Sequence, residues 1–450
     1  EFLIKICAFR RRRVSEGKEG MRLNMNYNKQ SVKEGITLHK INTTKFKTNL
    51  FAIFITTPLS RANVTKNALI SAVLRRGTEN FKSQELISKE LEDMYGASFD
   101  CGIDKNGDNQ ILKFYIESIN DDFLPENYNL AEKSLKLLAD IVFNPLVENG
   151  GFKKEYVDVE KNTLKQIIDG KIDNKSKYAL DRCFEEMYKG KPYGLYKFGY
   201  IEDLDKINEI DLYNYYKELI AECKIDVFVS GFNIDNLNEN AIFAGLNERS
   251  AKYIKITNNY INDKIEAPKE VIEKMDVTQG KLMIGIDLME LKEEERPMAS
   301  VYSVVLGGGA NSKLFQNVRE KASLAYTAGA SYIKSKNNII IRCGIEIKNY
   351  KKALDIIKDQ LNQMLNGDFS ENDINSAKQL ILSSYKGISE TQDGEINYYL
   401  SQELSDKFVD IDKSMQEIES VTKNQIIDIA KKLQINTIYF LTGNEELQGE

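Results

Sequence analysis

Histidine, cysteine and proline are all scarce in this 450-residue sequence, with one, five and six copies respectively. The cysteines are odd in number, far apart and free of CxxC pairs, so the sequence predicts neither a disulfide framework nor a thiolate zinc site. This usage is typical of a reducing compartment, and we expect a cytoplasmic protein. The five are Cys7, Cys101, Cys183, Cys223 and Cys343.

Long apolar runs are also missing. No segment approaches the ~18–20 uninterrupted apolar residues of a spanning helix, so we expect no membrane span. Within residues 1–20 the basic cluster follows the short apolar stretch, which is the reverse of a secretory signal. Met21 opens a segment that is typical of a natural start. We therefore interpret residues 1–20 as a translated leader or a disordered segment outside the fold.

A strong charge excess is absent as well. The 62 Lys and Arg residues nearly balance 68 Asp and Glu residues, which gives a net charge of −6. This mild value gives no reason to expect a nucleic-acid or membrane-surface partner. The run Gly307-Gly308-Gly309 is not followed by GK[ST] at the spacing of a phosphate loop, so we expect no nucleotide site and no cofactor.

What the sequence does contain is an alternation of two patterns. Segments rich in β-branched and aromatic residues are typical of half-buried strands. Between them lie segments with apolar residues at i, i+3, i+4 and i+7, which is typical of amphipathic helices. The strand-like segments are 48–57, 110–118 and 337–347, and the helical ones are 131–142, 159–169 and 350–365. The mixture predicts an α+β fold.

An internal repeat organises these segments. Gly77 and Gly309 lie 232 residues apart, and Gly96-Ala97-Ser98-Phe99 matches Gly329-Ala330-Ser331-Tyr332 at an offset of 233. Each match then runs into a strand and an amphipathic helix. Agreement in order and spacing predicts two copies of one domain of about 200 residues, produced by internal duplication.

The boundary between the copies is predicted from composition. Residues 246–270 are polar, contain a proline and lack a clean period, as linkers do. We therefore expect an N-terminal domain at 21–245, a linker at 246–270 and a C-terminal homologous domain at 271–450.

Three stretches carry a resemblance to a known family: VVLGGGANSKLFQNVREKASLAYTAGASY (304–332), LRRGTENFKSQELISKELEDMYGASFD (74–100) and KPYGLYKFGYIEDLDKI (191–207). Together they resemble the pitrilysin/insulinase-type (M16) zinc peptidases over roughly residues 30–450. The resemblance implies two homologous α+β domains, each a mixed, mostly antiparallel sheet packed with helices. It also implies a cavity between them that holds an extended peptide.

The zinc motif of that family, HxxEH on a helix, is lost here. The resemblance aligns its two histidines with Ala68 and Ala72 and its glutamate with Ser71, and a later helix offers Gln166 and Ile167 where the third ligand falls. The only histidine, His39, lies on a predicted strand well before this site, where a structural or surface role is expected. Zinc needs three protein ligands and hydrolysis a base, so we expect no metal and no hydrolysis by this chain alone.

A second set of family positions is retained. Arg319 and Tyr326 match the VREK and LAY motifs, and the resemblance implies that this pair holds a substrate carbonyl and donates to the oxyanion. We favour this role over one in which Arg319 merely pairs with Glu320 and Tyr326 packs in the core. Arg75 and Arg76 are interpreted as a solvated helix end.

The glycine run 307–309 permits two interpretations, a tight strand-to-helix turn or, as the resemblance implies, a flexible lip of the peptide cavity. In several branches of the family one chain carries HxxEH, and the other lacks it and contributes the Arg/Tyr pair. We therefore predict the non-catalytic subunit of a heterodimeric zinc peptidase, with an HxxEH-containing homologue as partner and a peptide or unfolded segment as ligand. The alternative is a peptide-binding or structural scaffold protein with no role in catalysis.

Overall fold

The structure is a computed structural model that describes residues 26–234, 262–405 and 408–444, together with residues 237, 246, 249, 254 and 256. The predicted leader at 1–20 lies outside these residues, as does most of the predicted linker. Strand β9 already begins at Lys269, so the second folded unit starts two residues before the predicted boundary.

The first half of the chain forms a six-stranded sheet, here called sheet 1, with the order β1-β2-β8-β3-β5-β4. Only β2 and β8 run parallel, and the other neighbours are antiparallel. The strands are β1 (Asn26–Lys33), β2 (Ile36–Asn42), β3 (Thr48–Pro58), β4 (Ser98–Asn106), β5 (Asn109–Ile119) and β8 (Lys224–Gly231). A small hairpin pairs β6 (Val147–Glu148) with β7 (Gly151–Phe152).

The second half forms a five-stranded sheet, here called sheet 2, with the order β11-β12-β10-β13-β9. Its one parallel pair joins β9 to β13. The strands are β9 (Lys269–Lys274), β10 (Gly280–Leu288), β11 (Ala325–Ile333), β12 (Asn338–Ile345) and β13 (Leu433–Thr442). The strands predicted from sequence at 48–57, 110–118 and 337–347 are therefore confirmed as β3, β5 and β12.

The two sheets repeat one topology. Read from one edge, β4-β5-β3-β8-β2 matches β11-β12-β10-β13-β9 in order and in the sense of every pair. One sequence match behind the predicted repeat is nevertheless wrong. Gly96 has a φ of 72° in the turn before β4, whereas Gly329 lies inside β11. The two four-residue motifs thus occupy different places, because short runs of small residues recur by chance.

Helices cover one face of each sheet, and their apolar stripes form the two main cores. In the first half they are α2 (Val64–Val73), α3 (Gln84–Asp93), α4 (Leu130–Phe143), α5 (Lys154–Asp169), α6 (Lys175–Met187), α7 (Ile201–Leu204) and α8 (Glu209–Glu222). In the second half they are α10 (Arg296–Gly307), α11 (Tyr350–Leu365), α12 (Glu371–Ile388), α13 (Gln392–Glu403), α14 (Ile411–Glu419) and α15 (Lys423–Ala430), with a π-helical segment at Phe315–Lys321. The predicted helices at 131–142, 159–169 and 350–365 are confirmed as α4, α5 and α11.

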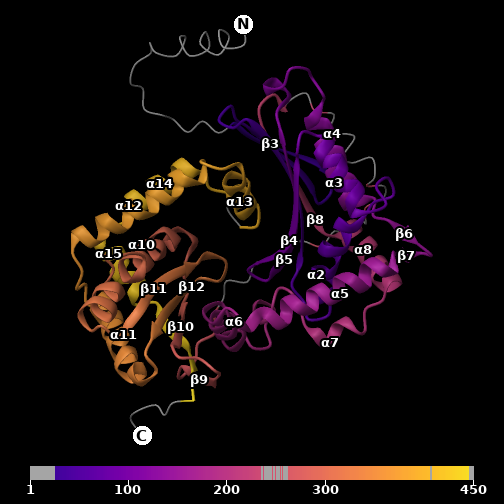
Figure 1. Ribbon diagram of the computed structural model, residues 1–450. Coiled ribbons are helices and arrows are strands. Elements are labelled where there is room, and N and C mark those ends of the chain that lie inside the picture. Colours follow the sequence, from indigo (N-terminus) through magenta and orange to yellow (C-terminus); the bar gives the residue numbers. More distant parts are fainter. Residues whose placement is uncertain are drawn as a thin grey trace, which may run out of the picture.

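One helix of each half packs against the sheet of the other half (Figure 1). Helix α6 of the first half packs through Cys183, Phe184 and Met187 on the outer face of sheet 2, against Met283 and Tyr439. Reciprocally, helix α13 of the second half packs on the outer face of sheet 1. This second contact joins Ile396, Tyr399 and Leu400 to Phe54 and Phe228.

No helix among the described residues is long and apolar enough to cross a membrane.

Candidate functional site

Helix α2 carries the positions that the sequence comparison places at a zinc motif. Ala68 and Ser71 are buried, and Ala72 is half-buried. The Ser71 hydroxyl donates to the carbonyl of Ala68 at 2.9 Å, so it is used within its own helix. These positions therefore serve packing, and an alanine methyl offers a metal no lone pair.

Helix α5 packs against α2 and carries the expected third-ligand positions, Gln166 and Ile167, on its exposed side. Neither is a carboxylate. Glu160, almost two turns earlier, is buried with 3% of its side chain exposed, and it accepts a hydrogen bond from Nε of Arg76. Arg76 also donates from Nη1 to Gln84 at 3.1 Å.

The prediction that Arg75 and Arg76 form a solvated helix end is therefore right for Arg75 and wrong for Arg76. The sequence contained a usable signal. Val157, Glu160 and Leu164 follow the i, i+3, i+7 spacing of the buried face of α5, and a carboxylate on a buried face requires a cation nearby.

The residues present do not fit a zinc ion. Among the described residues no group of three or more His, Cys, Asp and Glu side chains could hold a metal. The sequence's single histidine is fully buried in β2, with its Nε2 3.0 Å from Oδ1 of Asp226 and its Nδ1 2.8 Å from the hydroxyl of Tyr27. Both ring nitrogens of His39 are thus engaged in the fold.

A groove of about 580 Å³ lies between β4, β5 and α13, so both halves line it. Alternate residues of β4, among them Asp100 and Asp104, share the face that forms its floor. Lys113 and Lys197 both bind Asp104 at 3.2 Å. Burial opposes ionisation of Asp104, but the two lysines outweigh it and hold the pKa of that carboxyl below its usual range.

The remaining carboxylates of the groove are not neutralised. Asp100 and Glu117 from sheet 1 and Asp393 from α13 form no ion pair within the described ranges. Both lysines of the groove are already committed to Asp104. The groove therefore presents a negative surface that is completed by the second half of the chain.

Arg319 lies on the π-helical segment and Tyr326 on β11, the edge strand of sheet 2 that this segment contacts. The guanidinium of Arg319 lies 4.5 Å from the ring centre of Phe315, and its Nε is 3.6 Å from Glu320. Tyr326 is 60% exposed and occupies the point where the β11–β12 register shifts between Ala325 and Thr327. Such a bulge redirects a side chain out of the regular pleat.

The glycine run ends helix α10. A Cβ on Gly307 would overlap the backbone nitrogen of Ala330, so this glycine lets α10 approach β11 closely. A Cβ on Gly308 would meet Val304 of its own helix, whereas one on Gly309 would find only Leu380 at 3.7 Å. The prediction of a strand-to-helix turn is therefore wrong, because Gly307 is the last residue of a helix and is needed for its packing on β11. A role of Gly309 at a cavity lip stays a prediction.

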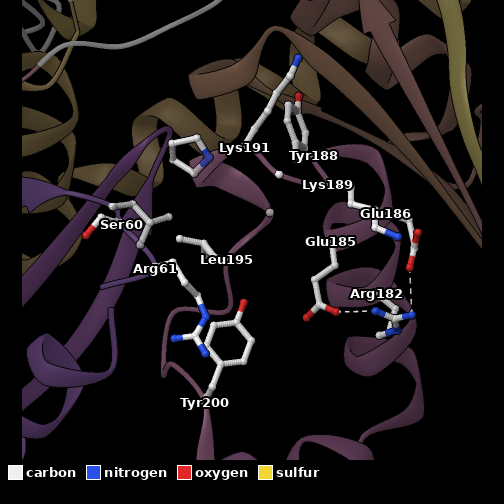
Figure 2. Close-up of a pocket in the computed structure, with 14 residues that line it drawn as sticks. Ser60, Arg61, Arg182, Glu185, Glu186, Tyr188, Lys189, Lys191, Leu195 and Tyr200 are labelled. Atoms are coloured by element: carbon white, nitrogen blue, oxygen red, sulfur yellow. Dashed lines mark hydrogen bonds and ion pairs between the residues drawn. The ribbon is translucent and has the colours of Figure 1, made fainter. Parts of the chain in front are cut away.

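A second pocket, of about 560 Å³, is lined by α6 and by the segment that carries KPYG (Figure 2). Its two arginines are bound to neighbouring groups. Arg182 pairs with Glu185 at 2.6 Å and with Glu186 at 3.0 Å. Arg61 pairs with Glu202 at 2.9 Å and stacks 4.1 Å from the ring centre of Tyr200. These closed ion pairs indicate that this stretch stabilises the fold.

Comparisons with known proteins agree with this geometry. The family model described as "Peptidase M16 inactive domain" matches residues 206–381. The chain is 37% identical over 412 residues to the probable inactive metalloprotease YmfF of Bacillus subtilis (strain 168), covering 91% of this chain and 96% of that protein.

Solved structures share the fold. A conserved protein from Enterococcus faecalis V583 superposes with a TM-score of 0.85 at 25% identity, covering 94% of this chain and all of that one. A peptidase M16 inactive domain from Pseudomonas fluorescens superposes with a TM-score of 0.75 at 17% identity, covering 95% of this chain and all of that one.

Proposed function

The chain belongs to the M16 peptidase family as an inactive homologue, and we propose that it is the non-catalytic subunit of a heterodimeric zinc peptidase. In this proposal it contributes a peptide-binding groove and the Arg319/Tyr326 pair to the active site of an HxxEH-containing homologue. We further propose that its two halves arose by duplication, which their shared sheet topology supports, and that the pair of subunits works in the cytoplasm.

The observation that carries the proposal is the exposure of Tyr326. A tyrosine that packs in the core, the alternative role for Tyr326, would bury its ring. Instead the ring is 60% exposed at a bulge, and no hydrogen bond of its hydroxyl is found among the described residues. Ala68 and Ser71, which the resemblance places at the zinc motif, are buried, so in this proposal the chain supplies a donor at Tyr326 and the partner supplies the metal.

The groove supports a peptide ligand. Residues of β4, an edge strand of sheet 1, line it, and an edge strand can pair with an extended chain. The N–H groups of Cys101 and Lys105 bond to the carboxylates of Asp100 and Asp104 on the same strand, and a peptide would have to displace them. Its uncompensated carboxylates Asp100, Glu117 and Asp393 favour segments that carry lysine or arginine. A scaffold protein would need the groove but would not need the exposed hydroxyl of Tyr326.

The test is the Tyr326→Phe variant in a heterodimer reconstituted with an HxxEH homologue. Loss of an oxyanion donor typically costs on the order of 100-fold in turnover, so we expect kcat to fall by about that factor with an unchanged melting temperature. Thr327→Val, which deletes the neighbouring hydroxyl on the same strand, serves as the matched control. Equal turnover by Tyr326→Phe and Thr327→Val would favour the scaffold alternative.

Arg319→Ala separates binding from chemistry. A guanidinium that holds a substrate carbonyl contributes before the transition state, so we expect KM to rise as well as kcat to fall. The chain alone should contain far less than one zinc per molecule by elemental analysis and should not cleave unstructured peptides. Stoichiometric zinc that disappears when residues 68–72 are altered would contradict the proposal.

A further inference from the structure

The edge strand β4 has two outward N–H groups that are already bonded. Asn106 belongs to the pair that closes the two-residue loop of the β4–β5 hairpin, so its N–H points toward β5. Successive residues of a strand direct their N–H groups to opposite sides, and those of Cys101 and Lys105 therefore point away from the sheet. Each donates at 2.9 Å to Oδ1 of the preceding aspartate, Asp100 or Asp104. These bonds occupy donors that an added strand would use.

The two aspartates are held to different degrees. Asp104 also binds Lys113 and Lys197, each at 3.2 Å, so its carboxylate is fixed by three donors. Asp100 is exposed, and among the described residues its bond to the N–H of Cys101 is its one hydrogen bond and it has no ion pair. Asp100 is therefore the aspartate that an incoming ligand can displace from the strand edge.

The surroundings of Asp100 favour a cation. Glu117 on β5 pairs with Ser98, two residues before Asp100, so the side chains of Glu117 and Asp100 are diagonal neighbours on one face of the sheet. Asp393 of α13 lines the same groove from the second half. An ammonium or guanidinium group in the groove would thus meet carboxylates at the place where a peptide backbone meets the N–H of Cys101.

We propose that Asp100 determines which peptides pair with β4, because its carboxylate competes with the peptide backbone for the N–H of Cys101 and a basic side chain of the peptide removes that competition. This inference rests on the peptide-binding groove proposed above. A lysine or arginine beside Asp100 replaces one charge-assisted bond of the carboxylate with another. A neutral peptide offers no such replacement, and the lost bond lowers its affinity by about tenfold.

Two peptides of about eight residues, acetylated and amidated at their ends, test this role. One alternates threonine with lysine and the other alternates threonine with glutamine, so one face of the bound strand carries the same side chain in every register. Calorimetric titration of the full chain measures their dissociation constants. The wild type should prefer the lysine peptide by about tenfold or more. Asp100→Ala frees the N–H of Cys101 and should raise the affinity for the glutamine peptide by about tenfold.

Glu117→Ala is the matched control. It removes the same charge from the groove without freeing a backbone donor, and both side chains are exposed, so melting temperatures should stay close to that of the wild type. The control should weaken the lysine peptide and leave the affinity for the glutamine peptide within about twofold. Asp100→Asn keeps an oxygen that can accept from Cys101, and its affinity for the glutamine peptide should stay near that of the wild type.

Hydrogen exchange of the β4 amides separates the role of Asp100 from the groove itself. The lysine peptide should slow exchange along β4 when it pairs with that strand. Absence of binding, or binding without this protection, would refute the groove and the role of Asp100 together. Protection of β4 combined with a glutamine-peptide affinity that Asp100→Ala leaves unchanged would overturn the role of Asp100 alone and leave the groove in place.

Discussion

Helices α2 and α10 occupy equivalent places in the two halves, yet their surroundings have diverged. The end of α2 has become interior: Ala68 and Ser71 are buried, and Arg76 is tied to Glu160 of α5. The end of α10 leads through a glycine run to Arg319 and Tyr326, which remain exposed. Equivalent helices of the two halves thus end differently, one in an ion pair with a buried glutamate and the other in a segment that leads to exposed polar side chains.

Removing the ion pair between Arg76 and Glu160 in the first half should have the largest effect on stability. Glu160→Ala leaves the guanidinium of Arg76, which is 25% exposed, without its buried partner, and we expect a loss of about 3 kcal/mol in the free energy of unfolding. Urea unfolding measures it. Asp158→Ala on the same helix removes only an exposed pair with Lys154 and should cost less than about 0.5 kcal/mol. Equal losses would mean that α2 and α5 do not depend on the ion pair.

The close packing of α10 on β11 at Gly307 should give the next largest effect on stability. Gly307→Ala forces a methyl group against the backbone of Ala330, and overpacking of this kind should destabilise the chain by about 2 kcal/mol. Gly309→Ala meets only an ordinary contact and should stay within about 0.5 kcal/mol of wild type. Melting temperatures of the two variants and the wild type measure this difference in stability. Equal destabilisation by both would show that the whole run is constrained.

The contact between α13 and sheet 1 contains a buried carboxyl group, that of Glu395. Glu395 has an unpartnered Oε2, and burial raises its pKa to about 7, opposed by Lys45, which is already bound to Glu390 and to the carbonyl of Ser389. The raised value means that the stability due to this group is complete below about pH 4.5 and is lost as pH rises through 7.

Glu395→Gln should therefore stabilise the chain by about 1–2 kcal/mol at pH 8 relative to its effect at pH 5. Urea unfolding at the two pH values is the measurement, with the exposed Glu419→Gln as control. The other charged groups on the facing sheet, Asp226, His39 and Lys224, bond to one another and should not contribute to this difference. A difference of the opposite sign would show that Glu395 is ionised in the folded chain.

Ser71→Ala should have the smallest effect. The hydroxyl bonds only to the carbonyl of Ala68 within the same helix, and alanine is the better helix former, so unfolding should change by less than about 0.5 kcal/mol. Turnover of the reconstituted heterodimer should also be unchanged, in contrast to Tyr326→Phe. A strong loss of turnover would assign Ser71 a role that its geometry does not suggest.

Local patterns predicted the elements well because period and burial are linked along one strand or helix. The runs that became β3, β5, α4 and α11 have one apolar face or a nearly continuous apolar core, and such faces are visible in sequence. The four-residue match between Gly96 and Gly329 failed because it carried no periodic information. The role of Arg76 was missed because its partner Glu160 lies on another helix, 84 residues away.

The sequence by itself determined that Ala68 and Ala72 cannot ligate zinc, since a side chain without a lone pair cannot become a ligand in any fold. It also determined the two-part α+β organisation and the survival of Arg319 and Tyr326. Only the tertiary structure decided that α6 and α13 pack on the opposite sheets and that Arg76 binds the buried Glu160. Whether a buried polar atom has a hydrogen-bond partner depends on atoms from distant parts of the chain, and a local sequence pattern does not show which distant segments come together.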